Sequence, residues 1–174
     1  MLRLFAAIAC VVLFATTFVA SRANSNQWTV DFDGYGPIKI GMRIDNAEKL
    51  LGMKLKIDNY LEDESCRCFD IKNEPAISFM TDHRVIVRMD VFAEQGGPAT
   101  DKGAKVGDSE ASVLAKYAGR IKVGPHHYTG PEGHYLRVYD AQGKVRVIFE
   151  TDGKKVTGYR VGRDPAVEYV EGCL

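Results

Sequence analysis

An internal repeat limits the folds open to this chain. Residues 38–52 combine a short β-branched run, a glycine turn, about two helical turns and a closing glycine. Residues 104–119 follow the same order. Apolar residues recur at helical spacing in both segments, and Asp45 and Ser109 are the expected N-caps.

The match continues further along the chain. Residues 79–91 and 149–161 share Phe-x-Thr-Asp, a turn residue, a basic residue and alternating apolar positions. The offset is 66 residues for the first pair of segments and 70 for the second, which a four-residue difference in one loop explains. Two matches in the same order predict a tandem repeat.

The second pair of segments also predicts β-hairpins. We expect the turns at Asp82-His83 and Asp152-Gly153, because positions with φ > 0 are best filled by Gly, Asn or Asp. Strict alternation after the first turn predicts one buried strand face. That face is formed by Val85, Val87, Met89 and Val91.

The expected fold class is α+β, with two related repeats. Each repeat is a short helix or helical hairpin packed on an antiparallel β-meander, with the second sheet face left for a partner or for the other repeat. Repeat one is placed at 24–97 and repeat two at 98–174. The expected strands are 66–71, 76–80 and 85–92 in repeat one, and 121–123, 135–140, 144–150 and 156–161 in repeat two.

The N-terminal segment has the composition of a secretory signal. Arg3 precedes an almost wholly apolar stretch, residues 4–20, and small residues follow at a cleavage site in 21–23. The stretch is short for a membrane span, and no positive cluster follows it. We therefore predict a signal peptide at 1–23, a periplasmic or secreted location, and no membrane insertion of the mature chain.

Charge and composition exclude two classes of protein. The 23 Lys and Arg residues equal the 23 Asp and Glu residues, so the chain lacks the basic excess of a nucleic-acid binder. Aromatic residues make up 10% of the chain, which excludes an acidic, aromatic-poor disordered tail. We expect no nucleic acid among the partners.

Three cysteines remain after the signal: Cys66, Cys68 and Cys173. A bridge between Cys66 and Cys68 would be strained, because positions i and i+2 of a strand lie about 6.5–7 Å apart. A long-range bridge from Cys173 to either Cys66 or Cys68 is favoured, and the odd count leaves one further thiol.

A metal site is the alternative use of these residues. Thiolates of Cys66 and Cys68 with imidazoles of His126, His127 and His134 would suit copper or zinc. Only one cysteine pair is present, however, about sixty residues from the histidines, and oxidation would remove a ligand. We predict no metal site and no cofactor.

Signatures of catalysis are absent from the sequence. It holds no Gly-x-Ser-x-Gly, Ser-x-x-Lys or His-Glu-x-x-His motif. Cys68 beside Arg67 has no evident base and orienting group, and the acidic run 62–64 is typical of a solvated loop. We predict that the protein is not an enzyme.

One loop, residues 124–135, has the composition of a recognition surface. It combines turn residues with tyrosine and histidine, and such loops on a rigid sheet commonly contact partners. An ordinary loop between strands is the alternative. The predicted partner-binding residues are His126, His127, Tyr128, His134 and Tyr135.

Two resemblances extend these expectations. The pattern Ile40-Gly41-Met42, Asp45, Ala47-Glu48 and Leu50-Leu51-Gly52 resembles the opening helix of the SmpA/OmlA (BamE-like) and β-lactamase-inhibitor-protein-like families. Those are small exported domains with a helical hairpin on an antiparallel sheet, and the inhibitor carries two copies. The resemblance implies a non-catalytic binding protein that contacts another cell-envelope protein, in an inhibitor-like or assembly-factor-like role.

The second resemblance is to a group of uncharacterised bacterial periplasmic proteins. It is carried by VGDSE at 106–110, FETDG at 149–153 and EGC at 171–173. In that group a Glu-Ser-Cys segment, matching 64–66 here, accompanies the C-terminal Gly-Cys. This resemblance implies a disulfide between Cys66 and Cys173.

Overall fold

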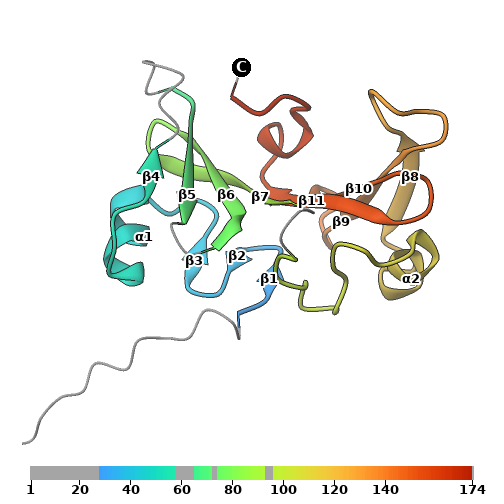
Figure 1. The fold of residues 1–174 in the computed structure, drawn as a ribbon, viewed down its shortest axis with the longest axis horizontal. Helices are drawn as coiled ribbons and strands as arrows, with labels where there is room; N and C mark the ends of the chain where they lie inside the picture. Colours follow the sequence, from blue (N-terminus) through green and yellow to red (C-terminus); the bar gives the residue numbers. More distant parts are fainter. Residues whose placement is uncertain (1–27, 58–64, 72–73, 93–95, 174) are drawn as a thin grey trace, which may run out of the picture.

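An antiparallel sheet of eight strands forms the centre of the molecule (Figure 1). The structure is a computed structural model, and it describes residues 28–57, 65–71, 74–92 and 96–173. The predicted signal peptide lies outside the described residues. Within these ranges, none of the helices has the length and apolar character that crossing a membrane requires.

The eight strands come in two consecutive groups of four, each preceded by a helix. Helix α1 (Ile44–Leu51) precedes the first group and α2 (Glu110–Lys116) the second. The first group is β4 (Lys56–Ile57), β5 (Arg67–Ile71), β6 (Glu74–Asp82) and β7 (Val85–Phe92). The second group is β8 (Ile121–Pro125), β9 (His134–Tyr139), β10 (Val145–Thr151) and β11 (Val156–Gly162).

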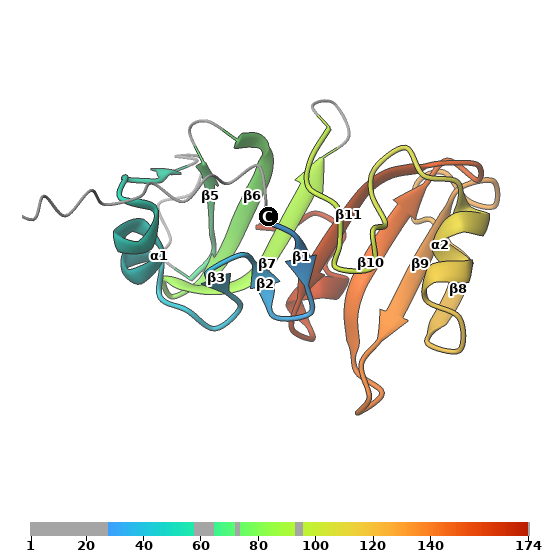
Figure 2. The ribbon, with the colours of Figure 1, turned by 90° about the horizontal axis from the view of Figure 1, so that it is seen from below.

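The predicted α+β class is confirmed, with a layered arrangement. A small sheet of β1 (Val30–Asp31), β2 (Gly34–Tyr35) and β3 (Ile38–Lys39) precedes α1. This small sheet and the two helices lie on one face of the large sheet (Figures 1 and 2). The C-terminal segment, with the 3-10 helix η3 (Ala166–Glu168), lies on the other face. Apolar side chains from both groups of strands share one buried core, including Phe69, Phe79 and Phe149.

The two groups join through their last strands. The strand order is β4-β5-β6-β7-β11-β10-β9-β8, so β7 pairs with β11. Asp90 lies opposite Arg160, its equivalent at the offset of 70 residues. The flanking pairs are Met89 with Val161 and Val91 with Tyr159. This is the register of an approximate two-fold axis that passes between Asp90 and Arg160.

The predicted alternation along β7 is wrong at its start. The pairing of β6 with β7 passes directly from Arg88 to Ile86, which leaves Val87 as the extra residue of a β-bulge. A bulge shifts the side-chain period by one residue, so Ile86 is fully buried. Val85 and Val87 are only half-buried, whereas Met89 lies in the core as predicted.

The first hairpin turn lies one residue later than predicted. Its residues are His83 and Arg84, with φ of 46° and 64°, between Asp82 and Val85. Neither residue has the usual preference for positive φ. Arg84 is held there by the rest of the fold, because its carbonyl accepts a hydrogen bond from the Ile44 N–H at 2.9 Å.

Arg84 also explains why Asp45 is not the N-cap of α1. The N-cap is Arg43, which makes no side-chain capping bond. The Asp45 carboxylate instead accepts a hydrogen bond from the Arg84 guanidinium at 2.5 Å, which holds the pKa of Asp45 below its usual value. In α2 the predicted cap is confirmed, since Ser109 Oγ accepts from the Ser112 N–H at 3.2 Å.

Two buried tyrosines fix the segment between the two groups of strands. The Tyr159 hydroxyl donates to the Pro98 carbonyl at 2.7 Å, and the Tyr117 hydroxyl donates to Thr100 Oγ1 at 2.9 Å. Burial raises the pKa of Tyr117 to about 12 and that of Tyr159 well above its usual range. Both hydroxyls therefore stay protonated as donors, which ties the predicted linker to the core.

Candidate partner-binding site

The loop between β8 and β9 is closed by its own backbone. The His126 N–H donates to the Gly133 carbonyl at 2.9 Å, and the Gly133 N–H donates to the Thr129 carbonyl at 2.9 Å. The Gly130 N–H donates to the His126 carbonyl at 3.0 Å. These bonds give residues 126–133 a defined shape without further strand pairing.

The His126 side chain forms the inner support of this loop. Its Nδ1 accepts hydrogen bonds from the backbone N–H groups of Tyr128 at 3.2 Å and Thr129 at 3.3 Å. Its Nε2 lies 3.5 Å from a carboxylate oxygen of Glu150 on β10. Since Nδ1 accepts, Nε2 carries the proton that points to Glu150. The imidazole thus fastens the loop to the sheet.

Tyr135 lies beneath His126 and is buried, with 3% of its surface exposed. The two ring centroids are 4.5 Å apart. Two guanidinium groups, Arg137 and Arg160, lie 5.1 and 5.4 Å from the tyrosine ring centre. Tyr135 therefore supports the loop from below, and the hydroxyl has no hydrogen-bond partner within the described part of the chain.

His134 connects the end of the loop to helix α2. Its Nδ1 is 2.8 Å from Oε1 of Glu110, in the first turn of that helix. The Thr151 hydroxyl donates to the same carboxylate oxygen. The His134 side chain is only half-buried, but its ring is committed to this contact.

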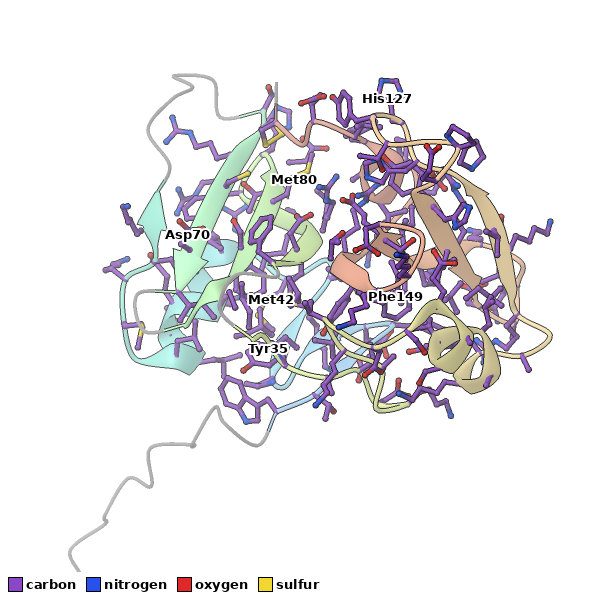
Figure 3. The ribbon with its side chains drawn as sticks, turned by 45° about the vertical axis from the view of Figure 1, so that its right-hand side comes forward. Tyr35, Met42, Asp70, Met80, His127 and Phe149 are labelled. Carbon is purple, nitrogen blue, oxygen red and sulfur yellow. A yellow bond between two sulfur atoms is a disulfide. The ribbon has the colours of Figure 1, made fainter. Side chains whose placement is uncertain are left out.

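The outer surface of the loop is formed by His127 and Tyr128. Tyr128 is 62% exposed, and the His127 ring stands edge-on to it with centroids 4.7 Å apart. Figure 3 shows His127 at the rim of the molecule. Of the five residues predicted to contact a partner, these two are exposed, and His126, His134 and Tyr135 hold them in place.

The cysteines are arranged as the periplasmic resemblance implies. Cys66 and Cys173 form a disulfide with an S–S distance of 2.12 Å and a Cα–Cα distance of 5.4 Å. The sulfur of Cys66 is therefore committed, and Cys68 retains its thiol. Across the described ranges, no three His, Cys, Asp or Glu side chains are grouped so as to hold a metal ion.

The C-terminal segment covers the middle of the sheet face that was expected to be open. Guanidinium groups on the sheet bind its carbonyl oxygens: Arg88 donates to Ala166 at 3.2 Å and to Tyr169 at 2.5 Å, and Arg160 donates to Val167 at 2.6 Å. Val167 packs in a small buried cluster on this face. The sequence signal was the position of Arg88 and Arg160 inside apolar strands, which requires buried partners.

A basic cavity of about 590 Å³ lies at the other end of β10. The nearby Asp140 carboxylate accepts hydrogen bonds from the Lys144 N–H at 2.9 Å and from Arg146 Nε at 2.6 Å, which hold the pKa of Asp140 below its usual value. Sequence reasoning missed this cavity, because its residues come from a hairpin turn and from the end of β11. It is lined by Gly143, Lys144, Arg146, Arg163 and Asp164.

Comparison with known proteins gives no relative for this geometry. No family model matches the sequence, and neither the curated proteins nor the solved structures contain a match.

Proposed function

We propose that this chain is a non-catalytic exported protein that binds another cell-envelope protein through the loop between β8 and β9. One observation carries the proposal: an exposed aromatic pair, His127 and Tyr128, stands on a base of buried and hydrogen-bonded rings. A rigid exposed tyrosine offers contact area at low entropic cost, as is typical of residues that dominate binding energy.

The disulfide supports the proposed location. Bonds of this kind persist in oxidising compartments such as the periplasm and the extracellular space. The arrangement also favours binding over metal storage, because Cys66 is bonded to Cys173 and His134 to Glu110. An inhibitor-like or assembly-factor-like role is part of the proposal and rests on the sequence resemblance alone.

We further propose that the two groups of strands are copies of one unit. Equivalent hydrogen bonds support this: Gly41 N–H donates to Ile86 at 2.7 Å, and Gly107 N–H donates to Val156 at 2.9 Å. A second bulge supports it too, since the pairing of β10 with β11 skips Thr157, the equivalent of the bulged residue of β7. The offsets of 66 and 70 residues predicted from the sequence apply to all of these positions.

The experiment is capture from a cell-envelope extract with the wild-type protein and with Tyr128→Ala as bait. We expect the variant to recover the bound protein with affinity reduced about 30-fold, since truncating a central aromatic anchor costs about 2 kcal/mol. Tyr169→Ala is the matched control, because Tyr169 is also an exposed tyrosine, at 46%, outside the loop. Equal affinity of wild type and Tyr128→Ala for the captured protein would refute the proposal.

A further inference from the structure

Strand β8 ends the large sheet beside the proposed binding loop. It pairs with β9 on one side only. The hydrogen-bond phase of this pair is fixed at both ends: Tyr139 N–H donates to the Arg120 carbonyl at 2.8 Å, and His126 N–H donates to the Gly133 carbonyl at 2.9 Å. Bonded residues alternate along an antiparallel pair, so the inward-facing backbone groups belong to positions 120, 122, 124 and 126.

The backbone groups of Ile121 and Val123 therefore point outward, away from β9. Within the described ranges nothing bonds to the N–H or C=O of either residue. Val123 is also 51% exposed, so the edge is open at this point. Pro125 has no N–H and ends the usable edge, which leaves residues 121–123 as a short template for another strand.

The charges along this edge are positive and lack acidic partners. Lys122 Nζ lies 5.0 Å from the ring centre of Tyr139, and the Arg120 guanidinium lies 4.9 Å from that of Phe32. Arg120 Nε donates to the Tyr139 carbonyl at 3.0 Å. No carboxylate of the described residues forms an ion pair with Arg120 or Lys122, so an added strand could supply one.

We propose that the binding partner contributes a short acidic segment in extended conformation, which adds to the open edge of β8 over residues 121–123. This inference rests on the proposed function and names the chemistry of the partner. Backbone hydrogen bonds from Ile121 and Val123 supply the pairing, and Arg120 and Lys122 select acidic side chains. The loop follows β8 directly, so a segment on the edge brings its owner against Tyr128.

A second copy of this chain is a poorer occupant of the edge. A two-fold pairing centred on residue 122 places Lys122 opposite Lys122 of the other copy. A pairing centred on Ile121 places Lys122 opposite Arg120. Like charges directly opposite on neighbouring strands are destabilising, whereas acidic residues at those positions are favourable.

The test uses an acetylated and amidated peptide of alternating valine and glutamate, with a valine–lysine peptide as its twin. The purified protein is titrated with each, and amide hydrogen exchange is followed residue by residue. We expect the glutamate peptide to slow exchange at Ile121 and Val123, and to bind at least about threefold more tightly than the lysine peptide. No slowing at these two amides, or equal binding of the twins, would overturn the inference. Slowing that depends on protein concentration without peptide would also overturn it, in favour of self-association.

Val123→Pro provides the matching variant. Proline removes the outward N–H and is tolerated on edge strands, so the β8–β9 pair is retained. We expect affinity for the glutamate peptide to fall about fivefold or more, the effect of one lost hydrogen bond and a steric clash. Val123→Thr keeps the N–H and should bind like wild type. Unchanged binding by a folded Val123→Pro protein contradicts the inference, and the wild-type exchange data decide the matter if that variant fails to fold.

Failure of this inference is distinguishable from failure of the proposed function. If the glutamate peptide protects the edge while Tyr128→Ala captures its protein normally, the proposed loop contact is wrong and the edge stands. If Tyr128 is required but the edge amides stay unprotected in the captured complex, the edge inference is wrong and the loop contact stands.

Discussion

The two groups of strands have the same backbone plan but differ in the side chains that support the loop. Phe79 and Phe149 occupy equivalent positions, and both are fully buried. By contrast, Ile44 of the first group corresponds to Glu110 of the second, and Met80 corresponds to Glu150. The apolar members of these two pairs are buried in the first half.

These two carboxylates hold the loop histidines. Glu110 contacts His134 and Glu150 contacts His126. The residues that recur between the halves are those that fold the chain, and the residues that differ include those that position the candidate site. The difference therefore identifies the second half as the one adapted for binding, without any reference to related proteins.

The largest expected effect comes from removing the disulfide, which joins the end of the second half to the first. Cys173→Ser should lower the free energy of unfolding by about 4–5 kcal/mol, because the bond closes a loop with a sequence separation of 107. Urea unfolding under non-reducing conditions measures it. Cys68→Ser is the control and should cost much less. Equal stability of the two variants would show that the bond does not constrain the unfolded chain.

The next effect compares equivalent core positions. Phe79→Ala and Phe149→Ala should each cost about 3–5 kcal/mol, since both rings are fully buried. Phe149 also contacts the rings of Tyr117 and Tyr159, with centroids 5.7 and 5.3 Å away, so its loss should be the larger. Thermal unfolding of the two variants measures both. A cost below about 1 kcal/mol at one position would mean that the two halves are not packed alike.

The smallest effect comes from giving the second half the first-half residue at one position. Glu110→Ile removes the acceptor for His134 and Thr151, so the loop should lose its tie to α2. We expect a stability loss of about 1 kcal/mol and faster amide exchange at residues 126–133. Glu132→Ile, a change on the exposed part of the loop, is the control. Unchanged exchange in Glu110→Ile would show that the loop keeps its shape without this carboxylate.

Local patterns predicted the larger strands but not what links them. The segments expected at 66–71 and 135–140 are strands within one residue of those limits. The two-residue strands β1, β2 and β4 were missed, because so short a segment shows no periodicity. The bulge at Val87 was missed as well, since it is fixed by pairing with β6 and not by composition.

The candidate site was predicted in composition but not in its division of roles. Turn residues, histidine and tyrosine located the loop correctly between two strands. The sequence did not distinguish Tyr128, which is exposed, from Tyr135, which is buried by residues of β10, β11 and the C-terminal segment. Burial of this kind depends on contacts between distant parts of the chain, such as that of Tyr135 with Val167.

The pairing of Asp90 with Arg160 has a consequence for how such a sheet could arise. On a two-fold axis between identical subunits, each residue faces its own copy, so a charge there would face a like charge. Within a single continuous polypeptide the two positions are encoded separately. A negative and a positive side chain can then sit opposite each other at the centre of the sheet, an arrangement that a symmetric ancestral dimer could not have made.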